Sequence, residues 1–257
     1  MAATDRAQLP RTRRSLNLAC MKLAIVSDIH GNLIAFDAVI AAVQEESPEL
    51  VVHGGDLVLN GPRPAEVVDR VRELGWPGIV GNTDEVLWGG MAKVPKPVRP
   101  QFKGMMDATA ALLGQERVQW LRRLPWEWRH EDLLLVHASP GDLWNCPMPD
   151  ASDEELQETY GGHEASTVVY CHIHVPFVRR VDGLLVANSG SVGWPVDGDW
   201  RPSYLVIEGD QVSVRRVEYD LERELAELRA SGYPSRSWLE EVHRQAEFVQ
   251  PFAQDQQ

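Results

Sequence analysis

The sequence predicts an α/β fold, and three observations indicate it. Between residues 22 and 80, short apolar runs alternate with segments in which apolar residues recur at helical spacing. Strand, helix, strand, helix, strand is the order of a parallel sheet with right-handed crossovers. Between residues 126 and 216 the chain consists mostly of short apolar runs separated by turns. Residues of metal-binding type follow most of the apolar runs, at strand ends, where an α/β sheet builds its site.

The first part of the chain combines buried strands with amphipathic helices. Three apolar runs are predicted to form strands: Lys22–Val26, Leu50–His53 and Gly78–Val80. The first helix is indicated by apolar residues at helical spacing: Leu33, Phe36, Ile40 and Val43. The second helix has Pro64 near its start and Gly75 just past its end. Residues 83–124 are predicted to be helical.

The second part is richer in strands, two pairs of which are predicted hairpins across Asp-Gly and Gly-Asp turns. Its predicted strands are Trp126–His130, Leu133–Val136, Val168–Cys171, Val178–Val181, Leu184–Ala187, Tyr204–Glu208 and Gln211–Arg216. Ser152 and Glu155 form a capping box that predicts a short acidic helix. Two further helices are expected near the C-terminus, one opening at Leu221 and one after Pro234.

Composition and charge exclude several classes of protein. The net charge of −13 argues against broad binding of nucleic acids or anionic membranes, which requires a basic surface. A small phosphate substrate remains compatible with this charge, because bound metal ions would reverse its sign locally. The sequence contains no apolar run that approaches the roughly 20 residues needed to span a bilayer.

The cysteines and the N-terminus suggest a compartment and a domain boundary. Three cysteines, with no CxxC pair, make a disulfide framework improbable and favour a reducing cytoplasm. Residues 1–20 are rich in arginine and form a poor signal peptide, so we expect a mobile tail before Met21. Residues 21–257 are expected to form a single domain that includes the C-terminal helices. The sequence does not indicate an oligomeric state.

Seven residues of metal-binding type are distributed over five short motifs. The motifs are Ser27-Asp28-Ile29-His30-Gly31-Asn32, Gly54-Gly55-Asp56, Gly81-Asn82-Thr83-Asp84, Val136-His137-Ala138 and Cys171-His172-Ile173-His174. Any one of the aspartates or asparagines could simply cap a helix or form a turn. Together with four histidines in this order, they point to a centre that holds two metal ions. Such a centre hydrolyses phosphate esters by activating water and neutralising charge on the phosphoryl oxygens.

The ordered motifs resemble the calcineurin-like metallophosphoesterase family, over residues 21 to 218. The similarity is greatest to its small bacterial phosphodiesterase-type members, as further segments indicate: Asn60-Gly-Pro-Arg-Pro-Ala-Glu-Val-Val, His137-Ala-Ser-Pro and Asn188-Ser-Gly-Ser-Val-Gly-Trp-Pro. The resemblance implies a four-layer α-β-β-α sandwich, in which two mixed β-sheets pack face to face and helices cover both outer sides.

The resemblance also implies a role for each motif residue. Asp28, His30 and His174 would hold the first metal, while Asn82, His137 and His172 would hold the second. Asp56 would bridge the two ions, and Asp56, Asn82, Thr83 and Asp84 are the residues expected to act in catalysis. The cofactor is expected to be two divalent metal ions. Manganese is the first expectation, and iron, nickel, cobalt or zinc also suit imidazole, carboxylate and amide ligands.

Two departures from the family pattern bear on the reaction. Thr83 stands where the family usually has histidine, so it can donate a hydrogen bond but cannot act as an imidazolium. Loss of a general acid typically costs about 10²–10⁴-fold where the leaving group needs protonation. Thr83 therefore favours activated or cyclic phosphodiesters. Cys171 and Ile173 replace the usual glycine and threonine around the histidine pair, and Cys171 is expected to be a small buried hydrophobe.

Three residues are candidates for substrate contacts. Trp144 and Trp194 lie in Pro/Gly loops soon after proposed ligands, where either could stack on a base or aryl group. Packing without substrate contact is the alternative for both. Arg63 follows the second motif and could reach a phosphate, although a solvated loop arginine is the simpler interpretation.

The leading functional hypothesis is a phosphodiesterase that hydrolyses small-molecule or nucleotide-type diesters by attack of a metal-bridging hydroxide. One alternative is a phosphomonoesterase, nucleotidase or bis-nucleoside polyphosphate hydrolase. The other is a non-catalytic protein-binding scaffold on the same fold, although a scaffold need not retain all seven ligand residues. The expected partner is a small phosphate ester.

Overall fold

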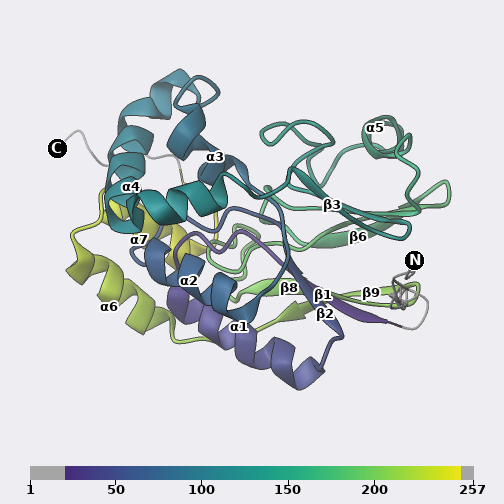
Figure 1. Cartoon of the computed structure of the whole chain (residues 1–257), viewed down its shortest axis with the longest axis horizontal. Helices are drawn as coiled ribbons and strands as arrows, with labels where there is room; N and C mark the ends of the chain where they lie inside the picture. Colours follow the sequence, from purple (N-terminus) through teal and green to yellow (C-terminus); the bar gives the residue numbers. More distant parts are fainter. Residues whose placement is uncertain (1–20, 250–257) are drawn as a thin grey trace, which may run out of the picture.

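The fold is built from two mixed β-sheets, as seen in a computed structural model that describes residues 21–249 (Figure 1). The predicted tail at residues 1–20 lies outside the described residues. The first sheet has the order β2-β1-β8-β9, and its strands are β1 (Lys22–Val26), β2 (Leu50–His53), β8 (Ser203–Glu208) and β9 (Gln211–Arg216). The second has the order β3-β4-β5-β7-β6, and its strands are β3 (Glu127–His130), β4 (Leu133–Val136), β5 (Thr167–Tyr170), β6 (Phe177–Val181) and β7 (Leu184–Asn188).

Both sheets combine parallel and antiparallel strands. In the first sheet β1 pairs in parallel with β2 and antiparallel with β8. In the second, β4, β5 and β7 are parallel neighbours, and the antiparallel strands β3 and β6 form the edges. The inner faces of the two sheets share one apolar core, in which Leu23 and Ile25 of β1 belong with Leu135 and Val169 of the second sheet.

Helices cover the outer faces of the sheets and complete the predicted four layers (Figure 1). Helices α1 (Leu33–Glu46) and α2 (Pro64–Leu74) pack on the first sheet, where Phe36 and Val67 are fully buried. The short helix α5 (Asp153–Tyr160) covers the second sheet and is capped by Ser152, whose hydroxyl accepts from the Glu155 N–H. At the other end, α6 (Leu221–Ser231) and α7 (Arg236–Gln245) pack against the long helix α4 (Arg99–Leu121).

Two predicted elements differ in the structure. Gly78–Val80 forms only a single bridge, between Gly78 and His53, rather than a third strand. Pro77 has no N–H to donate, and the chain turns away at Gly81 to begin the next helix.

Among residues 21–249, no helix is both long enough and apolar enough to cross a bilayer.

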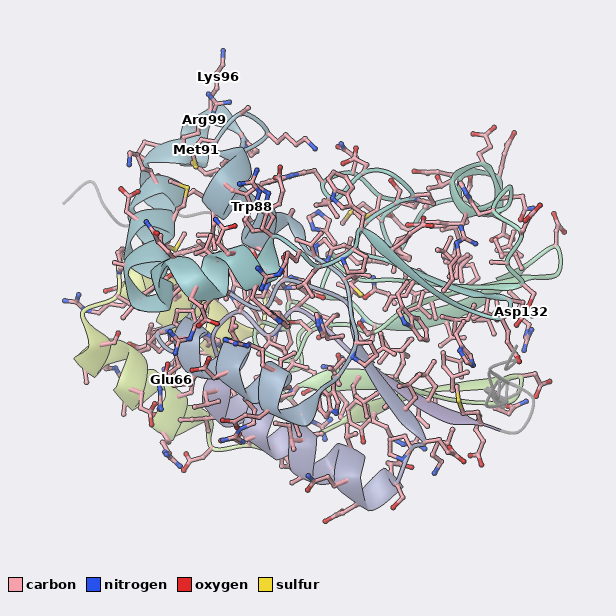
Figure 2. All side chains as sticks on the ribbon, in the orientation of Figure 1. Glu66, Trp88, Met91, Lys96, Arg99 and Asp132 are labelled. Carbon is pink, nitrogen blue, oxygen red and sulfur yellow. The ribbon has the colours of Figure 1, made fainter. Side chains whose placement is uncertain are left out.

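Residues 83–124 form separate helices instead of one helical stretch. Helix α3 (Asn82–Gly89) ends at Gly90, a one-turn 3₁₀ helix follows at Lys96–Val98, and α4 (Arg99–Leu121) is kinked at Gly114. Glycine breaks the helix at both interruptions because its backbone conformation there has positive φ. The Arg99 side chain donates to the carbonyls of Ala92 and Val94, and Figure 2 shows this residue at the tip of the helical region.

A buried carboxyl group on α6 makes stability depend on pH. Glu224 is fully buried, and neither of its carboxylate oxygens has a hydrogen-bond partner among residues 21–249. Burial, together with the nearby Glu227 carboxylate, raises the pKa of Glu224 from 4.5 to about 8. Between pH 4.5 and about pH 8, the Glu224 carboxyl group is therefore protonated in the folded protein and ionised in the unfolded chain.

We expect Glu224→Gln to stabilise the protein above neutral pH. The neutral form of Glu224 supports the fold below pH 4.5, and this stability is lost as the pH rises through about 8. The expected gain in unfolding free energy is a few kcal/mol at about pH 9 and close to zero at about pH 5. Thermal unfolding across this range measures it. Glu222→Gln, on the exposed side of the same helix, should show no such pH-dependent gain; equal pH profiles for both variants would refute the prediction.

Candidate metal centre

The seven predicted ligands come from loops at the carboxyl ends of strands and from one helix start. Asp28 and His30 follow β1, Asp56 follows β2, and His137 follows β4. His172 and His174 follow β5, while Asn82 is the first residue of α3. Five of the seven have left-handed backbone conformations, with positive φ: Asp28 54°, His30 50°, Asp56 51°, His172 70° and His174 58°. Such conformations are uncommon outside glycine and cluster at functional sites.

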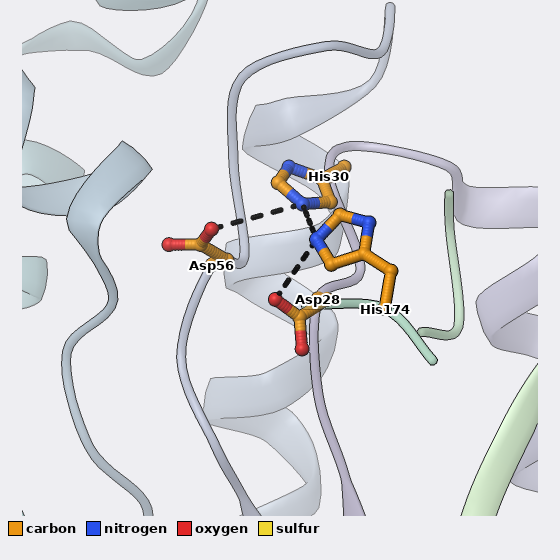
Figure 3. A group of neighbouring side chains, drawn as sticks. All are labelled: Asp28, His30, Asp56 and His174. Carbon is orange, nitrogen blue, oxygen red and sulfur yellow. Dashed lines mark hydrogen bonds and ion pairs between the residues drawn. The ribbon is translucent and has the colours of Figure 1, made fainter. Parts of the chain in front are cut away.

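In the first group of ligands, four side-chain nitrogen and oxygen atoms lie close together, one each from Asp28, His30, Asp56 and His174 (Figure 3). The Nε2 atoms of His30 and His174 are 3.1 Å apart, and His174 Nε2 is 3.2 Å from Asp28 Oδ1. Asp56 Oδ2 is 3.7 Å from His30 Nε2. All four side chains are buried, and their ligand atoms lie within 4.8 Å of one another. This spacing is compatible with one cation held by four ligands.

The second group shares Asp56 with the first. Asp56 Oδ1 is 3.4 Å from His137 Nε2. Asn82 Oδ1 lies between two imidazoles, 2.9 Å from His137 Nε2 and 2.8 Å from His172 Nδ1. Asp56 therefore presents one carboxylate oxygen to each group, the arrangement that the predicted bridging role requires. The structure brings together all seven residues predicted as ligands.

Hydrogen bonds behind two of the histidines orient them for metal binding. Backbone carbonyls lie next to their Nδ1 atoms: Gly54 O is 2.8 Å from His137 Nδ1, and Trp194 O is 2.7 Å from His174 Nδ1. An Nδ1–H that donates to a carbonyl leaves the Nε2 lone pair free for a cation. Asp28 Oδ1 points into the site and has no hydrogen-bond partner in the described part of the chain. The types of ligand atom and the orientation of these side chains are therefore both suitable for a pair of divalent cations.

The protonation of the histidines follows from burial and from neighbouring charges. Burial and the adjacent histidines lower the pKa of His30 and His172 to about 4, so both are neutral imidazoles at pH 7. Burial disfavours the charged form of His137 too, but the Asp56 carboxylate outweighs it and raises the pKa of His137 to about 9. A cation that binds His137 has to displace this proton, so its affinity increases with pH.

Asp84, predicted as catalytic, holds the loop that carries Asp56. One of its oxygens accepts from the N–H groups of Leu57 and Val58, and the other accepts from the Gly81 N–H. Asp84 is fully buried and does not line the cavity in front of the ligands. Its carboxylate ties the Asp56 loop to the start of α3, which makes it a positioning residue rather than a group that reaches substrate.

Thr83 lines the cavity, but its hydroxyl already donates a hydrogen bond within the protein. The hydroxyl donates to the Val58 carbonyl at 2.9 Å, and the Thr83 N–H donates to Asp56 Oδ1 at 2.8 Å. A threonine hydroxyl has one proton, so in this geometry that proton is not free for a leaving group. Its backbone N–H instead orients the carboxylate shared by the two ligand groups.

A cavity of about 570 Å³ opens in front of the ligands. Trp144 and Trp194, both predicted as substrate contacts, line it. Arg63 does not line it, because its guanidinium pairs with Glu66 and Glu227, each at 2.8 Å. The structure thus places both tryptophans in the cavity wall and does not bring Arg63 there.

Sequence reasoning missed two contributors to the site. Asn60 lines the cavity, and its side-chain nitrogen is 3.4 Å from His30 Nδ1. It lies four residues after Asp56 within a segment that carried the resemblance, so its place near a ligand loop was the available signal. Phe248, near the end of the described chain, also lines the cavity, and nothing in the local sequence indicates this.

Comparisons with known proteins identify the family of the chain. Residues 21–211 match the family described as the calcineurin-like phosphoesterase superfamily domain. An uncharacterised protein of Methanocaldococcus jannaschii is 27% identical over 243 residues, which are 85% of this chain and 96% of that protein. Phosphodiesterase YfcE of Escherichia coli is 26% identical over 204 residues, 76% of this chain and 91% of the relative.

Other relatives match over a shorter stretch or by structure. A symmetrical bis(5'-nucleosyl)-tetraphosphatase of Pectobacterium atrosepticum is 33% identical over 142 residues, 53% of this chain and 50% of that enzyme. The crystal structure of a metallophosphoesterase from Sphaerobacter thermophilus superposes with a TM-score of 0.76 at 28% identity, covering 88% of this chain and 99% of that one. The fold and the two ligand groups define a metal-dependent hydrolase. The chain belongs to the calcineurin-like phosphoesterase superfamily.

Proposed function

We propose that this protein is a phosphodiesterase that hydrolyses small phosphodiesters carrying an apolar or nucleotide-type ester group. The observation that carries the proposal is the composition of the cavity in front of the ligands. Among the described residues, its lining combines the proposed ligands with aromatic and aliphatic side chains and contains no lysine or arginine. A diester group carries one negative charge, whereas monoesters and polyphosphates carry more and would need additional cationic side chains.

The metal ions are proposed to be two divalent cations, with manganese as the first candidate. When bound, such a pair would supply an activated water and neutralise charge on the phosphoryl oxygens. Asp28, His30 and His174 would hold one ion, and Asn82, His137 and His172 the other, with Asp56 shared. The Thr83 N–H and the Asp84 carboxylate keep Asp56 in place for this role.

The leaving group is proposed to depart as an anion. Cys146 lines the cavity, but burial raises the pKa of its thiol to about 12, which makes it a poor proton donor at neutral pH. The Thr83 proton is donated to a carbonyl, and the described residues of the cavity lining include no further acid besides the proposed ligands. Aryl diesters, whose leaving groups are stable anions, and cyclic diesters suit this site best.

A substrate panel tests the proposal. Purified protein loaded with Mn²⁺ should hydrolyse bis(4-nitrophenyl) phosphate with a higher kcat/KM than 4-nitrophenyl phosphate or a bis-nucleoside tetraphosphate. Parallel assays with Fe²⁺, Ni²⁺, Co²⁺ and Zn²⁺ identify the preferred metal. A higher kcat/KM for the monoester or the tetraphosphate would favour the other enzymatic alternatives, and stoichiometric metal without any hydrolysis would favour the scaffold.

The compartment is proposed to be the cytoplasm. The two cysteines that the structure describes, Cys146 and Cys171, are both free thiols. Cys171 is fully buried between the ligand loops, which agrees with its predicted role as a small hydrophobe. Free thiols near a metal site are compatible with a reducing environment.

A further inference from the structure

The segment that follows α7 turns back onto the cavity. Ala246 has a left-handed conformation that ends the helix, and its carbonyl accepts from the Gly198 N–H at 2.8 Å. The Trp238 indole N–H donates to the Val249 carbonyl at 2.7 Å. These two bonds hold Phe248 from both sides, so its position is set by the fold. The segment lies outside the part of the chain that matches the superfamily, which ends at residue 211.

Aromatic contacts connect Phe248 to the proposed ligands. Its ring centroid is 6.3 Å from that of Trp194 and 6.4 Å from that of Trp238. Trp194 in turn lies edge-on to His30 and to His174, with ring centroids 5.5 Å apart in each case. A group bound against Phe248 would therefore lie on the side of the cavity that holds the first group of ligands.

The cavity mouth keeps apolar surface exposed. Phe248 is 57% exposed and Met148 is 55% exposed, yet both line the cavity. They come from segments about a hundred residues apart in sequence, and Phe102 of α4 lines the same cavity. Exposed apolar side chains that converge on a concave site gain free energy when an apolar ligand covers them. A hydrated phosphoryl group gains nothing from these contacts.

We propose that Phe248 and Met148 form an apolar subsite that binds one ester group of the substrate and thereby selects diesters with an aromatic or other large apolar group. The subsite rests on the proposed phosphodiesterase function and adds a specificity determinant to it. Phe248 is a binding residue in this proposal and takes no part in bond cleavage.

Binding of non-hydrolysable analogues tests the subsite without relying on activity. Diphenylphosphinate and dimethylphosphinate carry the same single charge as a diester and differ only in their apolar groups. Calorimetric titration of Mn²⁺-loaded protein should show that Phe248→Ala weakens diphenylphosphinate binding about fivefold and changes dimethylphosphinate binding by less than about twofold. Equal effects on both ligands, or on neither, would overturn the proposal.

Kinetics and matched variants separate this role from a structural one. Phe248→Ala should raise KM for bis(4-nitrophenyl) phosphate about fivefold and leave kcat within about twofold. Phe248→Leu should retain most of the affinity, and Glu247→Ala, on the same segment but outside the cavity lining, should behave as the wild type. A wild type that discriminates between the phosphinates but cleaves no diester would refute the proposed function alone. A wild type that cleaves diesters, with unchanged discrimination in Phe248→Ala, would refute the subsite alone.

Discussion

Asp56→Ala is expected to abolish hydrolysis of bis(4-nitrophenyl) phosphate, with a loss of at least about 10³-fold in kcat/KM. Asp56 presents one oxygen to His30 and the other to His137, so its removal disrupts both proposed metal positions at once. The variant should also retain less than one equivalent of metal after dialysis, measured by elemental analysis. Loss of metal and loss of rate should appear together, because one carboxylate serves both sites.

Asp107→Ala is the matched control for this change. Asp107 lies on α4, is mostly exposed, and its carboxylate pairs with Lys103 away from the cavity. Its alanine variant should keep wild-type kcat/KM and metal content. If Asp56→Ala folded normally and kept two metal equivalents with activity within tenfold of the wild type (about 1.4 kcal/mol in barrier), a bridging role for Asp56 would be wrong.

Gly81→Ala is expected to inactivate the protein although it adds a single methyl group. A Cβ atom at this position would lie 2.0 Å from Asp56 Oδ1 and 2.3 Å from the Asp56 backbone nitrogen. The backbone conformation of Gly81, with φ of −107°, suits any residue, so the requirement for glycine here is one of space. The methyl group has to displace the shared carboxylate. We expect loss of metal binding, loss of activity of about 10²-fold or more, and a cost of about 1–3 kcal/mol in stability.

The same substitution at Gly104 provides the comparison. A Cβ atom there would meet its nearest neighbour outside the helix backbone, in Pro234, only at 3.7 Å, and the position lies inside α4. Gly104→Ala should stabilise the helix by up to about 1 kcal/mol and leave activity unchanged. Thermal unfolding, metal content and rate measured side by side would distinguish the two sites. Full activity of Gly81→Ala would show that Asp56 tolerates displacement.

The secondary structure predicted from the sequence is confirmed where local patterns decide structure, but this kind of prediction has a limit. The helix from Pro64 to Leu74 begins and ends where proline and glycine predict, and the two C-terminal strands pair across the predicted turn. It failed at Gly78–Val80, where an apolar run of strand length leaves the sheet after one bridge. Strand pairing depends on a partner elsewhere in the chain, and no local pattern reports it.

The candidate site, like the fold, could be predicted only in part from the sequence. The α/β class, the seven candidate ligands and the reaction class were predictable from the sequence alone, because ligand chemistry resides in residue types and their order along the chain. The contacts of the neighbouring groups emerge only in the tertiary structure. The Thr83 hydroxyl donates to a carbonyl, the Asp84 carboxylate accepts from the loop that carries Asp56, and the Arg63 guanidinium pairs with glutamates. The tertiary structure also placed Phe248 at the cavity, far along the chain from every ligand motif. Hydrogen-bond partners and cavity walls are set by side chains that come together only when the chain folds, so residue order alone does not specify them.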